Sequence, residues 1–242
     1  MGDTTKLAVI ADIHANKYAL ESFLQYDEEN FQAEKILNLG DFVAIGPHPK
    51  EVVELVYNDK RFENIIGNNE IIVLGKRKSE WRRPTQPHHE WVANQLGQNL
   101  LKTIEETPTS KYLEFNGKKL LMLHSHFYDK PNRTFLDNLL IYQGKTLEEF
   151  INDYPEDVDI VLVGHSHSQL YIDWKKKKII NPGSISITWK PITSFCLLEI
   201  DGDTLNLNFK NIPYDFSKLR HDFDENKVVA KEFLIKYFYP FI

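Results

Sequence analysis

Short apolar runs alternate with amphipathic stretches along the first half of the chain. Residues 6–11 are unbroken and largely aliphatic, which predicts a strand buried on both faces. Residues 17–31 carry apolar side chains at close to every 3.6 positions, which predicts a helix. Two further strands, 35–39 and 64–66, enclose a second helix that starts at Pro49. This order is typical of parallel crossovers and predicts an α/β fold.

The second half of the chain is predicted to hold hairpins and one more buried strand. Asn116-Gly117 lies between two strand-like runs and is the strongest hairpin signal in the chain. Residues 159–163 predict a buried strand, because the four residues after Asp159 form a short apolar run. Residues 175–178 are four lysines, which we interpret as a solvated turn between two strands.

Two segments depart from the alternation of strands and helices. The segment at about 75–110 contains a group of basic residues, followed by a helix predicted over 88–106. We interpret this segment as a helical, basic insertion, because ~35 residues seldom form an independent core. A helical C-terminal tail is expected at about 216–242, and its aromatic end can cover either the chain's own core or a second copy in a homodimer. We predict a single domain over residues 1–242.

Composition and charge narrow the class of protein. The 242 residues are 42% hydrophobic and 26% charged, the balance of an ordinary globular protein. A net charge of -6 argues against a protein that binds nucleic acid duplexes by neutralising phosphates. Cys196 is the only cysteine, which excludes a disulfide framework and an all-cysteine zinc site. Without a segment resembling a signal peptide or a membrane span, we expect a cytoplasmic location.

Polar motifs follow the predicted strands at the point where each one ends. In open α/β sheets, binding sites form at the carboxyl ends of the strands. Asp12 and His14 are two residues apart, so in extended backbone their side chains point the same way. The complete set is Asp12-x-His14, Gly40-Asp41, Gly67-Asn68-Asn69, His124-x-His126 and Gly164-His165-Ser166-His167.

The side chains of these motifs are typical metal ligands. Oxygen and imidazole donors without thiolates suit manganese, iron, zinc, nickel or cobalt. Each motif alone is common in proteins that bind no metal, but their joint occurrence at strand ends is not. Two ions ~3.5–4 Å apart are a standard device for in-line displacement at phosphorus. Seven donors are too many for one ion and suit two ions bridged by a carboxylate: Asp12, His14, Asp41, Asn68, His124, His165 and His167.

The five motifs, in this order, resemble those of the calcineurin-like metallophosphoesterases. That family carries Asp-x-His, Gly-Asp, Gly-Asn-His-Asp/Glu, a lone histidine and Gly-His-x-His, and the match runs from about residue 7 to residue 184. The stretches VIADIHANKYALESFL and INPGSIS are similar to its small prokaryotic branch. That branch includes simple phosphodiesterases and an asymmetric diadenosine tetraphosphate hydrolase group. The resemblance implies a four-layered α/β/β/α sandwich of two mixed sheets flanked by helices.

The resemblance also implies a role for each ligand. It assigns the first of two divalent ions to Asp12, His14 and His167, and gives Asp41 the bridging position. The second ion goes to Asn68, His124 and His165. A hydroxide between the two ions is then the nucleophile. Manganese is the metal we expect first, with iron, zinc, nickel or cobalt as alternatives.

One position departs from the family pattern. Asn69 stands where the family usually has the histidine that is proposed to protonate the leaving group. Asparagine donates a hydrogen bond but cannot deliver a proton as an acid. Either the leaving group needs no proton, as in a polyphosphate chain, or His126 takes this role. A plain supporting role for His126 behind the ligand His124 is the other reading.

The substrate is expected to be a small phosphate ester or nucleotide. Arginine suits bidentate contact with phosphate, and the candidates are Arg77, Arg82, Arg83 and Arg133. The leading hypothesis is hydrolysis of a diester or phosphoanhydride, with asymmetric cleavage of diadenosine tetraphosphate to ATP and AMP as its sharpest form. The alternatives are a broad phosphodiesterase for cyclic or aryl diesters, and a non-catalytic scaffold with the fold of the retromer subunit.

Overall fold

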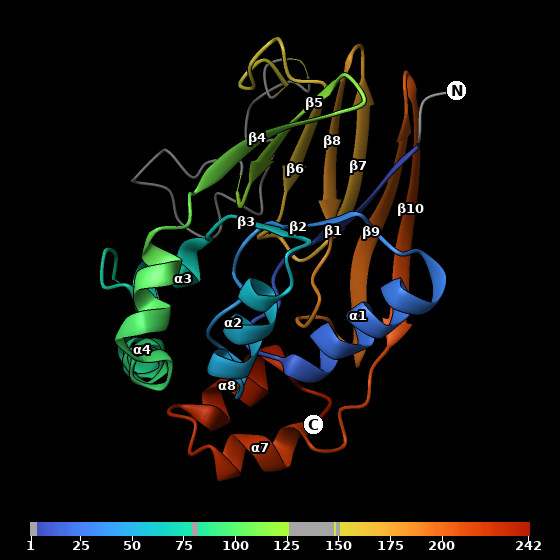
Figure 1. Ribbon diagram of the computed structural model, residues 1–242. Coiled ribbons are helices and arrows are strands. Elements are labelled where there is room, and N and C mark those ends of the chain that lie inside the picture. Colours follow the sequence, from blue (N-terminus) through green and yellow to red (C-terminus); the bar gives the residue numbers. More distant parts are fainter. Residues whose placement is uncertain (1–3, 79–81, 126–147, 149–150) are drawn as a thin grey trace.

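Two five-stranded mixed sheets pack face to face in the computed structural model, which describes residues 4–78, 82–125, 148 and 151–242 (Figure 1). The first sheet has the order β10-β9-β1-β2-β3. Its strands are β1 (Thr5–Ile10), β2 (Lys35–Asn38), β3 (Phe62–Asn64), β9 (Ile192–Asp201) and β10 (Thr204–Pro213). β1, β2 and β3 are parallel, and the hairpin of β9 and β10 joins β1 in antiparallel register.

The second sheet has the order β4-β5-β6-β8-β7. Its strands are β4 (Ser110–Phe115), β5 (Lys118–Leu123), β6 (Ile160–Val163), β7 (Gln169–Trp174) and β8 (Lys177–Pro182). β5, β6 and β8 are parallel, with β4 and β7 antiparallel at the two edges. The hairpin predicted at Asn116-Gly117 is confirmed as the turn between β4 and β5.

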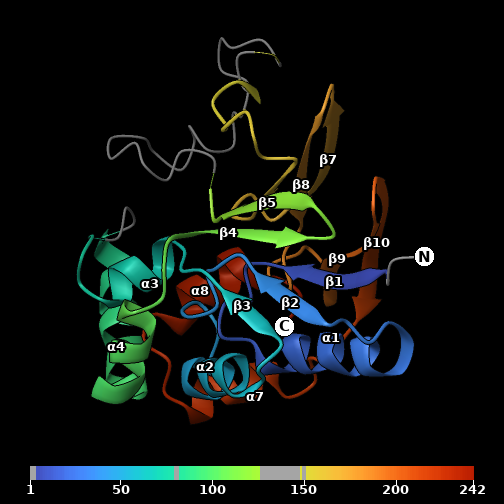
Figure 2. The same ribbon diagram turned by 45° about the horizontal axis from the view of Figure 1, so that its top comes forward.

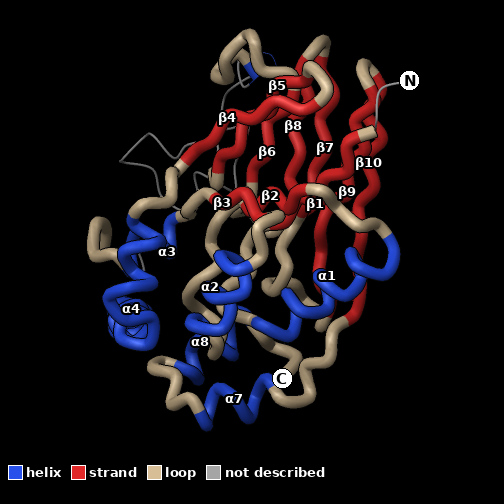
Figure 3. Tube along the Cα trace, in the orientation of Figure 1, coloured by secondary structure: helices blue, strands red, loops and turns tan. Residues whose placement is uncertain are grey.

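Alternation along the strands sorts the apolar side chains into three layers. Val9 of β1, Leu37 of β2 and Met122 of β5 lie between the sheets. Ile10 and Ile36 point to the other face of the first sheet, under the helices. The outer face of the second sheet packs against a cluster formed by Ile151, Tyr154 and Val158. This arrangement, visible as two layers of red strands in Figure 3, confirms the expected α/β sandwich of two mixed sheets.

Helices lie on one side of the first sheet, away from the second sheet (Figure 2). They are α1 (Lys17–Asn30), α2 (Pro49–Asn58), α3 (Asn68–Val73), α4 (Arg82–Glu105), α7 (Leu219–Glu225) and α8 (Lys231–Phe238). Phe23 of α1 and Val52 of α2 are fully buried against the sheet. Among the described residues, no helix is long and apolar enough to cross a membrane.

Two local expectations were wrong in detail. The helix predicted over 88–106 starts earlier, at Arg82, and is interrupted at Gly97, whose φ of 68° lies in the left-handed region that glycine tolerates. Lys177 does not belong to a solvated turn. It starts β8 and is only 9% exposed, because its ammonium donates to the carbonyl oxygens of Pro155 and Val158. A charge run predicts solvation only when its members find no buried acceptors.

The C-terminal tail packs on the chain itself. Leu219, Phe223 and Tyr239 are fully buried and share a cluster with Ile45 from the loop after β2. The tail therefore covers its own core, which was one of the two alternatives drawn from the sequence. The tail also packs against the loop that follows Asp41, one of the predicted ligands.

Candidate metal centre

The predicted ligands converge at the carboxyl ends of parallel strands from both sheets. Asp12 follows β1 and Asp41 follows β2 in the first sheet, while His124 follows β5 and His165 follows β6 in the second. Asp12, Asp41 and His124 are almost completely buried, with exposed fractions of 2% or less. The ends of these strands therefore bring the predicted ligands together.

The turns that carry these ligands have an unusual backbone. Asp12, His14 and Asp41 have φ values of 57°, 46° and 53°, in the left-handed region that L-residues seldom adopt. The extended geometry expected for Asp12 and His14 is therefore wrong, although their side chains still converge. Hydrogen bonds hold the two turns together, since the amide of His14 donates to the carbonyl of Asp41 at 2.9 Å. Such conformations persist where the surroundings determine them, which is common at functional sites.

Asp12, His14 and His167 form the first cluster of donors. The Nε2 atoms of His14 and His167 lie 3.2 Å apart, and Asp12 Oδ1 lies 3.8 Å and 3.5 Å from them. Asp12 Oδ1 is buried and has no hydrogen-bond partner among the described residues. Burial lowers the pKa of His14 to about 4, so its imidazole is neutral near pH 7 and can offer a lone pair. A buried acceptor facing two imidazole nitrogens fits a cation.

Asp41, His124 and His165 form the second cluster, and Asn68 adds an oxygen. His124 Nε2 lies 3.3 Å from Asp41 Oδ2, 3.2 Å from His165 Nδ1 and 3.0 Å from Asn68 Oδ1. On the far side of the ring, His124 Nδ1 contacts the carbonyl of Leu39 at 2.8 Å. This contact leaves Nε2 to face the cluster, as outer hydrogen bonds do for metal-bound imidazoles.

The spacing of the donors fits divalent ions. With metal–ligand bonds of about 2.1 Å, neighbouring ligands stand about 3.0 Å apart around an octahedral ion and about 3.4 Å around a tetrahedral one. Within each group of three, the donor atoms all lie within 4.8 Å of one another. The two groups therefore can each hold one ion, with oxygen and nitrogen donors and no thiolate.

Strong electrostatic coupling links Asp41 to both clusters. Burial disfavours the charged form of Asp41, but the imidazoles of His124 and His14 outweigh it and hold the pKa of this carboxyl well below its usual range. Burial likewise lowers the pKa of His124, yet Asp41 raises it overall to about 10. The pocket thus favours positive charge beside Asp41, which a bound cation would supply in place of the proton.

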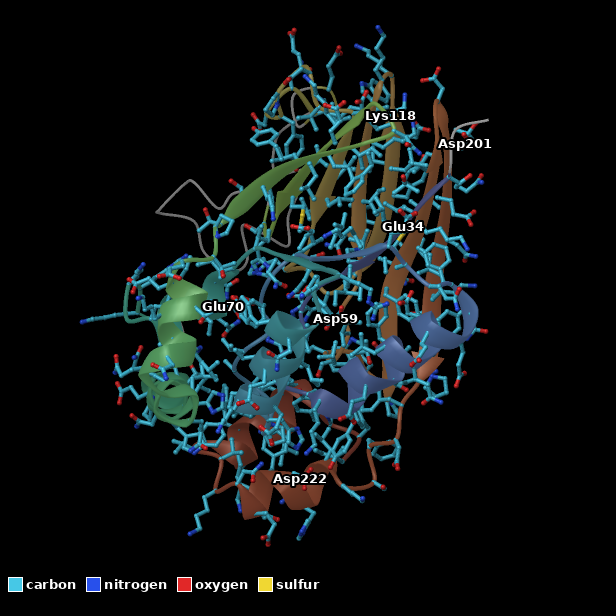
Figure 4. The ribbon with its side chains drawn as sticks, in the orientation of Figure 1. Glu34, Asp59, Glu70, Lys118, Asp201 and Asp222 are labelled. Atoms are coloured by element: carbon cyan, nitrogen blue, oxygen red, sulfur yellow. The ribbon has the colours of Figure 1, made fainter. Side chains whose placement is uncertain are left out.

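Glu70 is a buried residue beside Asp41 that the sequence analysis did not single out. Its carboxylate is fully buried and accepts hydrogen bonds from the amides of Asp41, Val43 and Gly67 at 2.9, 2.9 and 2.7 Å. Burial and the nearby Asp41 carboxylate raise the pKa of Glu70 to about 7. Figure 4 labels it on α3. The available signal was a glutamate three residues after Gly67, the spacing of a capping box at the start of α3.

Gly67 is required because there is no room for a side chain. A Cβ atom there would lie 2.3 Å from Asp41 Oδ1, 2.8 Å from the Asp41 amide nitrogen and 2.8 Å from His124 Nδ1. The backbone of Gly67 passes directly against the second cluster. The next residues, Asn68 and Asn69, can therefore reach Asp41 and His124 from the first turn of α3.

Asn69 lies beside Asp41 and uses both ends of its amide. Its backbone N–H donates to Asp41 Oδ1 at 2.8 Å, and its side-chain Nδ2 donates to Asp41 Oδ2 at 2.6 Å. Its Oδ1 lies 2.9 Å from Nε2 of His89, a buried residue of α4 that the sequence did not single out. No local pattern marks His89, because its partner is 20 residues away.

Of the remaining candidates, the structure describes only the side chain of Arg77. The side chain of Arg77 is exposed in the turn after α3. Arg82 and Arg83 begin α4, but their side chains lie outside the described part of the structure. His126 and Arg133 lie outside the described residues altogether. Their predicted roles in leaving-group protonation and phosphate binding stay predictions.

Comparisons with known proteins agree with this architecture. The uncharacterized protein MJ0912 of Methanocaldococcus jannaschii is 28% identical over 242 residues, covering 92% of this chain and 93% of that protein. A metallophosphoesterase from Sphaerobacter thermophilus superposes with a TM-score of 0.72 at 22% identity, over 97% of this chain and 98% of that one. The hypothetical protein PH1004 from Pyrococcus horikoshii OT3 gives a TM-score of 0.72 at 18% identity over the same shares.

The two solved structures share the fold of this chain, and a match to a family model shows the family to which the chain belongs. The model of the calcineurin-like phosphoesterase superfamily domain matches residues 5–203, which include every donor of the two clusters. The resemblance seen in the motifs is thereby confirmed. The chain belongs to the calcineurin-like phosphoesterase superfamily.

Proposed function

We propose that this protein is a dinuclear metal-dependent phosphohydrolase for small nucleotide-type substrates. The observation that carries the proposal is the pair of buried donor groups, Asp12 with His14 and His167, and Asp41 with His124 and His165. Both groups are complete in a chain of the phosphoesterase superfamily. A scaffold has no need to keep seven converging donors in place, four of them buried, so the complete set favours hydrolysis.

Each donor has a role in holding the ions. We assign the first ion to Asp12, His14 and His167, and the second to Asn68, His124 and His165. Asp41 suits the bridging position because its charge acts on both groups: it opposes the lowering of the His14 pKa by burial and raises the pKa of His124. Two bound divalent ions would activate water for attack and offset the negative charge of the phosphate oxygens.

The bond cleaved is, in this proposal, a phosphodiester or a phosphoanhydride with a good leaving group. Asn69 cannot deliver a proton, and its amide is already bound to Asp41 and His89. A leaving group that needs no proton, such as a nucleoside polyphosphate, is compatible with that arrangement. We therefore propose asymmetric hydrolysis of diadenosine tetraphosphate to ATP and AMP as the first activity to test.

The test is turnover of diadenosine tetraphosphate with added Mn²⁺, with separation of the nucleotide products. We expect ATP and AMP in equal amounts, and a loss of at least about 100-fold in kcat for Asp41→Asn, since a carboxylate between two metals is replaced by a neutral amide. Asp59→Asn is the matched control, because Asp59 belongs to neither donor group and pairs with Arg61. It should keep the activity of the wild type.

An activated aryl diester run in parallel separates the alternatives. Cleavage of the aryl diester alone would support the broad phosphodiesterase and refute the dinucleotide substrate. No cleavage of either compound by protein that binds two Mn²⁺ ions would refute hydrolysis and leave the scaffold. Manganese as the native metal, a cytoplasmic location and a homodimer remain predictions.

A further inference from the structure

His89 lies behind the candidate metal centre and comes from the segment 75–110. It sits in the first part of α4, is only 5% exposed, and contacts Asn69 at the first turn of α3. Figures 1 and 2 both show α3 and α4 side by side at the same edge of the molecule. A buried imidazole at this point is costly unless both of its nitrogens are hydrogen-bonded.

Both ring nitrogens of His89 do have partners. Nδ1 lies 2.7 Å from the carbonyl oxygen of Thr85, one turn earlier in the same helix. Nε2 lies 2.9 Å from Oδ1 of Asn69. Both partners are carbonyl oxygens, which only accept hydrogen bonds, so a neutral ring can donate to just one of them; donation to Asn69 places that hydrogen on Nε2.

The orientation of the Asn69 amide is fixed independently of His89. Its other end lies 2.6 Å from Asp41 Oδ2, and the oxygens of a carboxylate ligand accept hydrogen bonds. Turning the amide round would place two oxygen acceptors against each other at Asp41. The end facing Asp41 is therefore the NH₂ group, and the end facing His89 is the oxygen.

With that hydrogen on Nε2, these contacts form one directed chain of hydrogen bonds. Nε2–H of His89 donates to Asn69, and the amide of Asn69 donates to Asp41. With the backbone N–H of Asn69, both oxygens of the Asp41 carboxylate accept from this one residue. The carboxylate that lies between the two donor groups is thus oriented by Asn69, and Asn69 is oriented by His89.

We infer that His89 is a positioning residue of the metal centre: through Asn69 it fixes the Asp41 carboxylate in the orientation that binds two divalent ions. The inference rests on the proposed function for the presence of those ions. The inference also gives a role to the segment 75–110, because this segment places the imidazole of His89 next to Asn69, behind the candidate metal centre. Burial lowers the pKa of His89, whereas Thr85 and Asp41 raise it; the inference requires only the hydrogen on Nε2.

Two substitutions of similar size test this chain of bonds. In His89→Gln the terminal NH₂ group lies near the position of Nε2 and can still donate to Asn69. In His89→Asn the shorter side chain reaches only toward Thr85. We expect His89→Asn to bind Mn²⁺ at least about 10-fold more weakly than the wild type, the usual effect of losing an outer partner of a ligand. His89→Gln should stay within about 3-fold.

The readout is Mn²⁺ binding by calorimetry, with electron paramagnetic resonance to distinguish a coupled pair of ions from single ions. The effect of His89→Asn should vanish in an Asn69→Ala background, because the relay is then already broken. Equal Mn²⁺ affinity of all three proteins would overturn the inference. Equal weakening in both variants, or additive effects of His89→Asn and Asn69→Ala, would also overturn it, since the loss would not pass through Asn69.

One measurement needs no variant to fold. Nitrogen-15 spectra of the wild-type histidine rings should show a protonated Nε2 at His89; an unprotonated Nε2 contradicts the donor role. Binding of Mn²⁺ is measured without substrate, so the result does not depend on the reaction. If the wild type binds two Mn²⁺ ions but cleaves nothing, the proposed function fails while the role of His89 is still decided.

Discussion

His88 should make the metal-free protein sensitive to acid. The residue is fully buried in α4, next to His89, and its Nε2 accepts a hydrogen bond from the amide of Ile45 at 2.8 Å. Burial, reinforced by His89 and opposed by the backbone of Val229, lowers the pKa of His88 from 6.5 to about 3. Protonation at Nε2 would also destroy the bond from Ile45, so the folded state needs the neutral ring.

The size of the effect follows from proton linkage. The unfolded chain binds a proton at His88 below its ordinary pKa of 6.5, whereas the folded protein resists it until about pH 3. The stabilisation is therefore complete above pH 6.5 and is lost as the pH falls toward 3. From about pH 7 to about pH 5 the two values give a loss of about 2 kcal/mol in the free energy of unfolding from this one residue.

The assay is urea unfolding at both pH values with EDTA present, because metal binding to the other histidines also depends on pH. His88→Gln is the perturbation, since its oxygen can accept from Ile45 and its amide does not titrate. The variant should lose about 2 kcal/mol less than the wild type over this interval. Equal losses in the two proteins would show that His88 is readily protonated in the folded state and would refute the reasoning.

Two further predictions concern the metal centre itself. Gly67→Ala places a methyl group 2.3 Å from Asp41 Oδ1 and 2.8 Å from its backbone nitrogen. We expect calorimetry to show at least about 10-fold weaker Mn²⁺ binding, and urea unfolding to show a loss of about 1–3 kcal/mol in the free energy of unfolding. Unchanged Mn²⁺ affinity would contradict the close approach of Gly67 to Asp41. Removing metal with EDTA should lower the free energy of unfolding by about 2.7 kcal/mol for each ion held at 100 times its Kd. Thermal unfolding of the wild type and of Asp41→Asn with and without EDTA checks this, because only the wild type should respond fully.

The local sequence carried most of the fold and the ligand types. Uninterrupted apolar runs such as 160–163 marked buried strands, because burial on both faces excludes polar side chains. Asn116-Gly117 marked a hairpin, because its turn requires positive φ. The donors Asp12, Asp41 and His124 were visible because each directly follows such a run. Each of these patterns lies within a few residues of the strand, turn or donor that it predicts.

The division of the donors between two clusters came from the family resemblance and not from the pattern. His165 and His167 are two residues apart, yet they lie in different clusters. Both have φ values in the left-handed region, 67° and 57°, so the turn sends neighbouring side chains in different directions. A sequence pattern that assumes extended backbone cannot anticipate this.

Only the tertiary structure revealed the supports behind the ligands. Glu70, His89 and Lys177 are polar residues buried by partners that are distant in the sequence. Their positions in α3, α4 and β8 look ordinary, because nothing nearby in the chain tells whether a buried acceptor will meet them. Hydrophobic periodicity reports which face of an element is buried, but a hydrogen bond between two elements depends on how those elements pack. The sequence therefore determined the fold and the chemistry of the donors, and the packing decided how the donors are held.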